Sequence, residues 1–223
     1  EAFPNPDTLS EKLYRQIIGQ YERELRKEEQ QMDDRYREMV EYYTMWTHQI
    51  KTPIAAMHLL LQEEETPVSK ELQGELFLVE QYVQMALQYL RMERMNTDLV
   101  FEKQELDALI HQAVRKYAPL FIRRKIALQY EDVHCQILTD EKWLEFVLEQ
   151  VLSNALKYTR KGKIKIYMDP QSPKTLVIED TGIGIAPEDL PRVFERGYTG
   201  YNGRTDKRST GIGLYLCRQI MDR

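Results

Sequence analysis

The sequence predicts an α+β protein in which a long helical part precedes a mixed domain of short helices and strands. Between Leu9 and about Glu65 the only glycine is Gly19 and the only proline is Pro53, and the stretch is rich in residues that form helices well. Beyond residue 100, short helical patterns alternate with runs that are typical of strands. A chain of this organisation belongs to a globular protein with two domains.

The composition of the chain indicates which binding partners and which cellular compartment to expect. The 223 residues are 42% hydrophobic, and 31 basic against 36 acidic residues give a net charge of −5, which offers no footprint for nucleic acid. Cys135 and Cys217 match no metal-ligand spacing, which favours a reducing compartment. No apolar stretch reaches the ~18 residues of a membrane span. Because the chain begins at Glu1 rather than Met, we expect a cytosolic piece of a longer protein whose other part can contain membrane spans.

The first helical stretch carries an apolar seam with a seven-residue repeat, which is typical of a coiled coil or helical bundle. A turn at Glu65–Ser69 follows, with Thr66 as the expected N-cap and Pro67 at the first helical position. A second amphipathic helix then runs to about Asn96. Two such helices predict a hairpin, and pairing of two hairpins into a four-helix bundle predicts a homodimer. The seam consists of Ile18, Leu25, Met32, Met39 and Trp46.

The second domain is predicted from alternating patterns along the chain. Its expected helices cover residues 106–123 and 140–158, and a final helix starts near Gly213. Its expected strands cover residues 126–130, 135–138, 163–167 and 175–179. Residues 197–210, with three glycines and several polar side chains, are expected to form a loop.

Two glycine pairs have the properties of phosphate cradles. Asp180-Thr181-Gly182-Ile183-Gly184 directly follows a predicted strand, so the backbone can approach a ligand closely while Asp180 accepts a hydrogen bond. Gly211 and Gly213 open the last helix, where free N–H groups and the helix dipole favour an anion. Judged singly, the first pair is better explained as a plain turn, and the alternative for the second is a flexible turn that enters a helix.

The predicted helix before the strands carries polar residues on one face. Gln150 and Asn154 are four residues apart, and Lys157 and Tyr158 follow in the next turn. An amide oxygen can ligate Mg²⁺, and an ammonium suits a phosphate. The alternative is an ordinary solvent-facing helix surface.

Taken together and in this order, the motifs resemble those of sensor histidine kinases of bacterial two-component systems. His48–Pro53 resembles the phospho-acceptor box, Gln150–Thr159 the N box and Asp180–Gly184 the G1 box. Phe194 resembles the F box and Gly211–Leu214 the G2 box. The resemblance implies a dimerisation and phospho-acceptor domain at residues 1–98 and an ATP-binding α/β sandwich of the GHKL type at 99–223. Because the family adds closing strands after the last helix, we expect these strands to be missing here.

The resemblance also implies a role for each matching residue. Asn154 is expected to ligate Mg²⁺, Asp180 to bind the adenine amino group, Tyr158 to pack beside adenine and Lys157 to meet a phosphate. Gly182, Gly184, Gly211 and Gly213 would shape the pocket and its lid, and Phe194 would belong to the same cofactor site. Gln150 stands where the family usually has asparagine, so its role as a second magnesium ligand is the weaker expectation.

His48 is the expected nucleophile, because a neutral imidazole has a lone pair available near pH 7. Many family members have a carboxylate at the next position, whereas this chain has Gln49, which can orient the ring but cannot take its proton. Thr52 lies one turn later, where its hydroxyl could position a water for dephosphorylating a response regulator. His111 and His134 are interpreted as having no carboxylate or cysteine constellation, so no catalytic role is expected for them.

The sequence therefore predicts a protein-histidine kinase that uses ATP and Mg²⁺, phosphorylates itself on His48 and passes the phosphoryl group to a response-regulator aspartate. Residues 42–53 also resemble a narrower group of kinases that respond to peptide antibiotics together with ABC transporters. Two alternatives remain open. One is a GHKL-type ATPase that activates water with Glu149, and the other is a non-catalytic scaffold that binds ATP.

Overall fold

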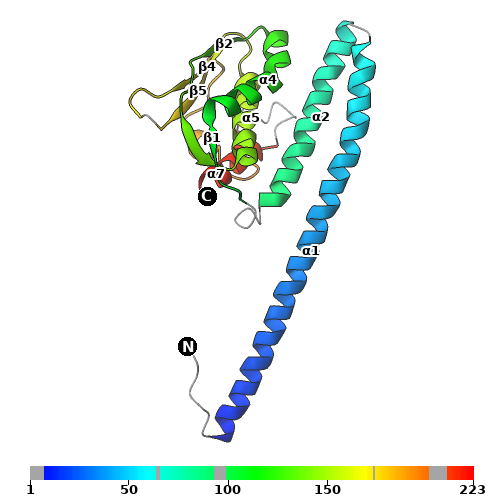
Figure 1. Cartoon of the computed structure of the whole chain (residues 1–223), viewed down its shortest axis with the longest axis vertical. Helices are drawn as coiled ribbons and strands as arrows, with labels where there is room; N and C mark the ends of the chain where they lie inside the picture. The colour runs from blue at the N-terminus through cyan, green and yellow to red at the C-terminus, as the bar shows by residue number, and fades with distance from the viewer. Residues whose placement is uncertain (1–7, 64–65, 93–98, 173, 201–209) are drawn as a thin grey trace. The chain divides into compact units, whose positions relative to one another are not determined.

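The computed structural model describes residues 8–63, 66–92, 99–172, 174–200 and 210–223. The chain divides into two compact units, Glu1–Glu65 and Thr66–Arg223, which are described separately. The elements are α1 (Leu9–Gln62), α2 (Pro67–Arg91), β1 (Glu102–Glu105), α4 (Leu106–Arg124), β2 (Ala127–Tyr130), β3 (Gln136–Thr139), α5 (Glu141–Tyr158), β4 (Lys163–Met168), β5 (Leu176–Asp180), η2 (Leu190–Arg192) and α7 (Gly213–Met221) (Figure 1).

Helix α1 accounts for the described part of the first unit. It is one continuous α-helix of 54 residues that contains Pro53, so the predicted long helical part is confirmed. Its predicted seam is exposed to solvent, and the exposed fraction reaches 68% at Met32. A helix with an apolar seam needs a partner to cover it. The predicted hairpin, bundle and homodimer stay predictions.

Helix α2 begins as the sequence predicts. The Thr66 side chain accepts a hydrogen bond from the backbone of Ser69, and the Ser69 hydroxyl accepts one from the backbone of Thr66, with Pro67 at the start of the helix. This reciprocal pair satisfies two backbone donors that the helix itself leaves without partners. The α-helix ends at Arg91, and the predicted end near Asn96 lies outside the described residues.

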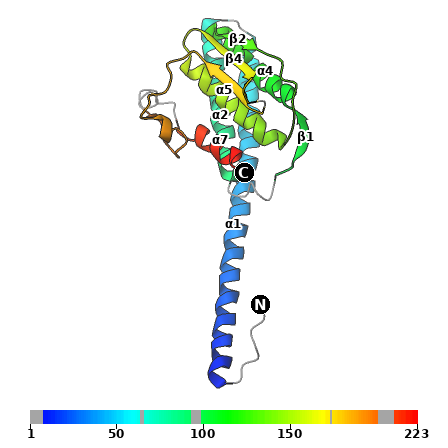
Figure 2. The ribbon, with the colours of Figure 1, turned by 90° about the vertical axis from the view of Figure 1, so that its left-hand side faces the viewer.

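The rest of the second unit, residues 99–223, is called the lobe here. Strands β2, β4 and β5 form a sheet in the order β2-β4-β5, with β2 parallel and β5 antiparallel to β4. Strands β1 and β3 form a separate antiparallel pair. Helices α4 and α5 cover one face of the larger sheet (Figures 1 and 2). The lobe is thus a helix-on-sheet sandwich, and the α+β fold class is confirmed.

Two apolar clusters hold the lobe together. The larger one joins the facing sides of α4 and α5 to β4, whose Ile164 and Ile166 are fully buried. The smaller one joins α5 to α7 through Trp143, Phe146 and Leu216. Helix α5 contributes to both clusters, and burial of such side chains contributes about 1.5–3 kcal/mol each. Consequently α5 is the element that fixes where the predicted polar face lies.

Two elements were not predicted, the strand β1 and the short 3-10 helix η2. Strand β1 has the sequence Glu102-Lys103-Gln104-Glu105, which lacks the apolar alternation of a strand, and it forms because it pairs with β3. The other helices and strands of the lobe lie within two residues of their predicted positions. The predicted domain boundary after residue 98 adjoins residues that are not described and stays a prediction.

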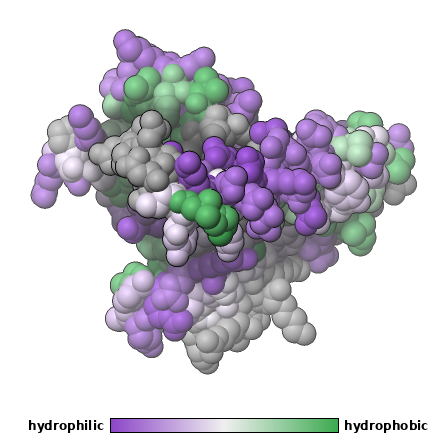
Figure 3. Space-filling view, turned by 90° about the horizontal axis from the view of Figure 1, so that it is seen from below, coloured by the Kyte–Doolittle hydropathy of each residue, from purple (hydrophilic) through white to green (hydrophobic). Residues whose placement is uncertain are grey.

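Within the residues that the structure describes, none of the helices combines the length and the hydropathy needed to cross a bilayer. On the face seen in Figure 3, apolar areas are small and separated by hydrophilic side chains.

Candidate active site

A cavity of about 310 Å³ lies where α5, the turn after β5 and the start of α7 meet, with one side of α2 completing its wall. Most of the residues that the sequence analysis singled out in the lobe line this cavity. They are Gln150, Asn154, Lys157, Tyr158, Asp180, Gly184, Gly211 and Gly213. The volume is within the range of small-molecule sites. The fold therefore brings together motifs that are separated by more than fifty residues along the chain.

Helix α5 supplies the amide side chains. Its N-terminus is fixed by Asp140, whose carboxylate accepts the backbone N–H of Trp143 (3.2 Å). Asn154 is half-buried, whereas Gln150 is only 6% exposed, and its Oε1 lies 2.6 Å from where a Cβ on Gly213 would be. The two predicted amide ligands thus face one cavity, and Gln150 also packs against the start of α7.

The turn after β5 explains why glycine follows Asp180. Asp180 Oδ1 accepts the backbone N–H of Gly182 (2.8 Å) and the Thr159 hydroxyl (3.4 Å). A Cβ on Gly182 would lie 2.6 Å from both Asp180 Oδ1 and the carbonyl oxygen of Tyr158. Only glycine allows this close approach. The turn is therefore locked against the C-terminal end of α5, and Asp180 is held at the cavity wall.

The turn before α7 is fixed in a similar way. Gly211 has a φ of +66°, and a Cβ there would lie 2.4 Å from the Gly197 carbonyl carbon and 2.7 Å from the backbone of Tyr198. The Gly197 N–H donates to the Gly211 carbonyl (3.0 Å). Gly213 and Leu214, at the start of α7, line the cavity, and the N-terminus of a helix is a place where proteins bind phosphate.

The predicted phospho-acceptor residues lie on α1. His48, Gln49 and Thr52 are all exposed, and the Thr52 hydroxyl donates to the His48 carbonyl (3.4 Å). Thr52 therefore lies on the same side of the helix as His48, as the four-residue spacing predicts. An exposed imidazole is accessible to an electrophile, so the geometry of α1 is compatible with a nucleophilic role.

Comparison with known proteins identifies the family. Residues 139–223 match the family of histidine kinase-, DNA gyrase B- and HSP90-like ATPases. The sensor histidine kinase YxdK of Bacillus subtilis is 33% identical over 214 residues, which cover 93% of this chain and 64% of that protein. The sensor protein BceS of Halalkalibacterium halodurans is 37% identical over 179 residues, which cover 79% and 54%, respectively. Residues 139–223 thus belong to this ATPase family, and most of the chain is similar to sensor histidine kinases.

Other relatives agree with this assignment. The sensor histidine kinase GraS of Staphylococcus haemolyticus is 36% identical over 213 residues, which cover 94% of this chain and 60% of that protein. The chain thus spans between about half and two thirds of the length of these curated relatives. The crystal structure of full-length ShkA in complex with AMPPNP aligns with a TM-score of 0.56 at 21% identity, covering 82% of this chain and 40% of that one. This similarity supports the GHKL-type fold.

Two of the cofactor residues predicted from the kinase motifs do not line the cavity. Gly182 is absent from the cavity lining, and its backbone packs closely against Asp180 and the carbonyl of Tyr158, as described above. Phe194 is 42% exposed, and its ring lies 5.9 Å from the guanidinium carbon of Arg218. Their assignment to nucleotide binding remains a prediction, and the contacts indicate that both shape the surroundings of the site.

The structure adds cavity residues that sequence reasoning missed. From α2 come Gln81 and Met85, and from the segment after β5 come Asp189 and Tyr198. Gln81 accepts a hydrogen bond from the Tyr117 hydroxyl (2.8 Å), and both side chains are buried. No motif marked these positions, because their approach depends on how α2 packs against the lobe and on the local path of the chain after β5.

Glu149, the residue that an ATPase would use as a base, does not line the cavity. Its side chain is 2% exposed and pairs with Lys116 of α4 at 2.5 Å. Burial raises the pKa of the Glu149 carboxyl, and the Lys116 partner opposes that shift. Burial, with the Glu149 charge nearby, likewise raises the pKa of Tyr117. Glu149 is therefore part of the packing between α4 and α5.

A second group of ionisable residues corrects the interpretation of His111. Its Nε2 lies 3.4 Å from Asp107 Oδ2, one helical turn away, so a carboxylate does stand beside it. Asp107 also accepts hydrogen bonds from the Tyr130 hydroxyl and the Val133 N–H, which lower its pKa in that order. His134 and Cys135 line a separate cavity of about 430 Å³ next to Asp107. Unlike the first cavity, this one has no glycine turn in its lining, and its amide side chain is that of Gln136 on β3.

The amide oxygens of Asn154 and Gln150 fit the role of magnesium ligands only together with the phosphate oxygens of a bound nucleotide. Among the described residues, His, Cys, Asp and Glu form no group of three or more that could hold a metal ion. Mg²⁺ keeps several waters and commonly shares substrate phosphate oxygens. Asn154, and Gln150 beside it, could therefore complete a shell that a triphosphate supplies in part. Bound there, Mg²⁺ would neutralise charge that develops on the phosphates.

Proposed function

We propose that the protein is an ATP-dependent histidine kinase that phosphorylates itself on His48 and then passes the phosphoryl group to an aspartate of a response regulator. The observation that carries the proposal is the single cavity in which amide side chains, Asp180 and the glycine turn before α7 come together. The similar ShkA chain was crystallised in complex with AMPPNP, an analogue of ATP, which supports the choice of nucleotide.

The proposed reaction breaks the bond between the γ-phosphorus and the β–γ bridging oxygen and forms a bond from a His48 ring nitrogen to phosphorus. ADP leaves, and the imidazole loses a proton. Catalysis in such transfers depends mainly on positioning and charge neutralisation. The chain's own residues would hold the adenine at Asp180 and Tyr158 and the phosphates at Lys157 and the start of α7. Gln49 cannot accept the proton, so water is the proposed acceptor.

The site roles of Gln49 and Thr52 belong to the same proposal. If Gln49 orients the ring, Gln49→Glu should change both the rate and the pH profile of autophosphorylation, because a carboxylate can accept the ring proton. If Thr52 positions a water, Thr52→Ala should leave autophosphorylation unchanged and slow dephosphorylation of the regulator. An unchanged profile for the first variant, or unchanged dephosphorylation for the second, would remove the respective role.

The decisive experiment is incubation with γ-labelled ATP. We expect a label that is stable in base and labile in acid, which is lost in His48→Ala and retained in the matched control His58→Ala on the same helix. Free phosphate without label would instead support the GHKL-type ATPase, and bound but unreacted ATP would support the scaffold. The ATPase alternative is disfavoured by the position of Glu149, which is buried against Lys116.

The proposal includes a homodimer in which residues 1–98 form the dimerisation domain and residues 99–223 the catalytic domain. The exposed seam of α1, which includes Ile18 at 49% and Leu25 at 52% exposure, supports an interface between helices. Light scattering should give a molar mass that is twice the chain mass of 26.6 kDa. The double variant Ile18→Asp with Leu25→Asp should have the mass of one chain. A monomeric unsubstituted chain would contradict the dimer.

The narrower proposal is attachment to a membrane and work with an ABC transporter in sensing antimicrobial peptides. It is supported by the resemblance of residues 42–53 to that group and by the relatives YxdK, BceS and GraS, which are named as sensors. Purification of the full-length protein from detergent-solubilised membranes tests it, because the transporter should co-purify. Recovery of the kinase without any transporter would contradict this part.

A further inference from the structure

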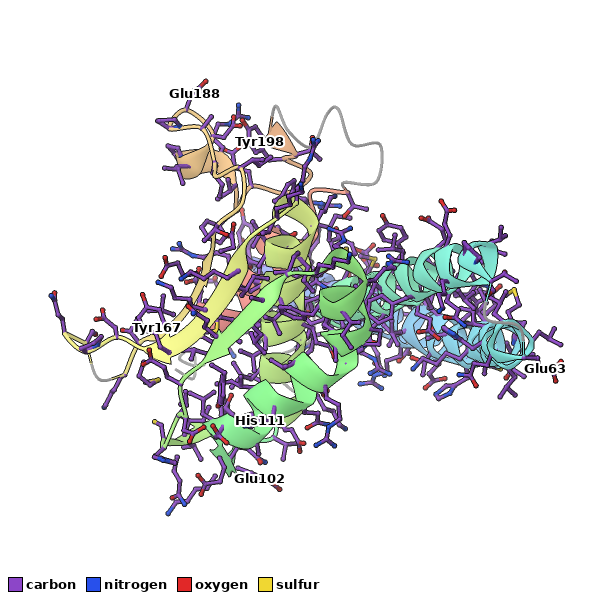
Figure 4. All side chains as sticks on the ribbon, turned by 90° about the horizontal axis from the view of Figure 1, so that it is seen from above. Glu63, Glu102, His111, Tyr167, Glu188 and Tyr198 are labelled. Atoms are coloured by element: carbon purple, nitrogen blue, oxygen red, sulfur yellow. The ribbon has the colours of Figure 1, made fainter. Side chains whose placement is uncertain are left out.

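Tyr198 stands at the rim of the cavity in a set of contacts that none of the sequence motifs explains. Its hydroxyl donates to Asp189 Oδ1 at 2.6 Å, and the guanidinium carbon of Arg192 lies 4.3 Å from its ring centre. Glu195 Oε2 in turn accepts from Arg192 Nε at 3.0 Å. Asp189, Arg192, Glu195 and Tyr198 are called the rim clamp here. Figure 4 shows Tyr198 on the same side of the lobe as Glu188.

The rim clamp holds the carboxylate of Asp189 beside the proposed binding site of an anion. Asp189 is half-buried and lines the cavity in which a triphosphate is proposed to bind. Its Oδ2 lies 2.8 Å from where a Cβ on Gly200 would be, and Gly200 has a φ of +58°. The Asp189 side chain is thus held between the Tyr198 hydroxyl and the Gly200 backbone. A carboxylate on the wall of an anion site opposes binding if it turns toward the ligand.

The backbone near Tyr198 is fixed independently of its side chain. The Tyr198 N–H donates to the Glu195 carbonyl (3.2 Å), and the neighbouring Gly197 is joined to Gly211. Because these bonds involve only main-chain atoms, loss of the Tyr198 hydroxyl should leave the path of the chain intact. The hydroxyl can therefore be tested separately from the fold.

We propose that Tyr198 is a positioning residue for nucleotide binding: its hydroxyl holds the Asp189 carboxylate at the rim, against Gly200 and away from the phosphate end of the ligand. The inference rests on the proposed function only in taking a nucleoside triphosphate as the ligand. It assigns Tyr198 a role that acts through Asp189, and it predicts that the two residues are coupled.

The test measures equilibrium binding of a fluorescent ATP analogue, with unlabelled ATP and adenosine as competitors. Tyr198→Phe should weaken ATP binding about three- to tenfold, the range expected for the net contribution of one typical hydrogen bond, and should leave adenosine binding unchanged. Asp189→Asn removes the charge, so the double variant Asp189→Asn with Tyr198→Phe should bind ATP as Asp189→Asn does. The control Tyr167→Phe removes a comparable hydroxyl-carboxylate bond to Glu179 (3.4 Å), outside the cavity, and should bind as the unsubstituted chain does.

Two results would overturn the proposal. One is unchanged ATP affinity in Tyr198→Phe, and the other is a double variant that binds as weakly as Tyr198→Phe alone, which would show that the Asp189 charge is not involved. A chain that binds ATP but gives no label on His48 would contradict the proposed kinase function, while the affinities would still decide the role of Tyr198. Thermal unfolding of each variant confirms that it is folded.

Discussion

The predicted reactive residue of α1 and the cavity residues of the lobe are held in position in different ways. On α1, His48 is an exposed side chain whose position depends only on the regular helix around it. In the lobe, the cavity residues come from α5, β5, α7 and the segment between β5 and α7, and each is held by contacts with another element. A reactive group on a helix is therefore nearly independent of packing, whereas a binding cavity is a property of the whole lobe.

The largest expected effect is at Gly211. Gly211→Ala forces a Cβ against the backbone of Gly197 and Tyr198 at a positive φ. We expect the free energy of unfolding to fall by about 2–5 kcal/mol and the binding of an ATP analogue to be lost. Gly184 is the matched control, because it also has a positive φ (+68°) but nothing within 4 Å of an added Cβ. Gly184→Ala should cost only about 1 kcal/mol in urea unfolding, and equal costs would show that the close approach is unimportant.

The next effect concerns the buried pair in the lobe. Lys116→Met leaves the Glu149 carboxylate buried without its partner, which should cost about 2–4 kcal/mol at pH 7. Burial already raises the folded-state pKa of Glu149, so the folded state binds its proton more tightly than the unfolded state. Stability should therefore fall as pH rises above the unfolded value of about 4.3, and the loss should vanish below it. Urea unfolding between pH 4 and pH 8 measures this, and a loss independent of pH would contradict it.

A smaller loss of stability is expected when the N-cap of a helix is removed, and two helices, α5 and α2, can be compared. Asp140 is 8% exposed and accepts the N–H groups of both Trp143 (3.2 Å) and Val100 (2.9 Å). Asp140→Ala should destabilise the lobe by about 2 kcal/mol, because two backbone donors lose their partner. Thr66→Ala removes the cap of α2 and should cost about 1 kcal/mol. Thermal unfolding of both variants measures the two losses. A larger loss for Thr66→Ala than for Asp140→Ala would contradict this ranking.

The smallest expected effect on stability is at His48 itself. His48→Ala replaces an exposed side chain with the best helix former, so the free energy of unfolding should change by less than about 0.5 kcal/mol. Circular dichroism during thermal unfolding provides the measurement. A large loss would mean that α1 depends on His48 for packing, and the contrast between the two regions would then be wrong.

The sequence predicted the site residues better than it predicted their neighbours. Asn154, Asp180 and Gly211 could be found because each belongs to a local pattern of helix, strand or glycine turn. The contact of His111 with Asp107 has a readable four-residue spacing and was nevertheless missed. Tyr198 and Asp189 are nine residues apart and meet only through η2 and the turn that follows it, so no local period reveals them. Likewise, β1 exists because of its partner β3 rather than its own residues.

Pro53, which α1 accommodates without interruption, gives the phospho-acceptor turn a distinctive mechanical property. Proline has no N–H, so the Gln49 carbonyl cannot accept the usual bond from residue 53, and the proline ring crowds that carbonyl. The turn directly after His48 is therefore held by one fewer backbone bond than the turns around it. In a hydrogen-exchange experiment this should be the point at which the interior of a helix of about 80 Å opens first, after the fraying ends. The residue that is to receive the phosphoryl group thus adjoins the weakest turn of an otherwise uniform rod.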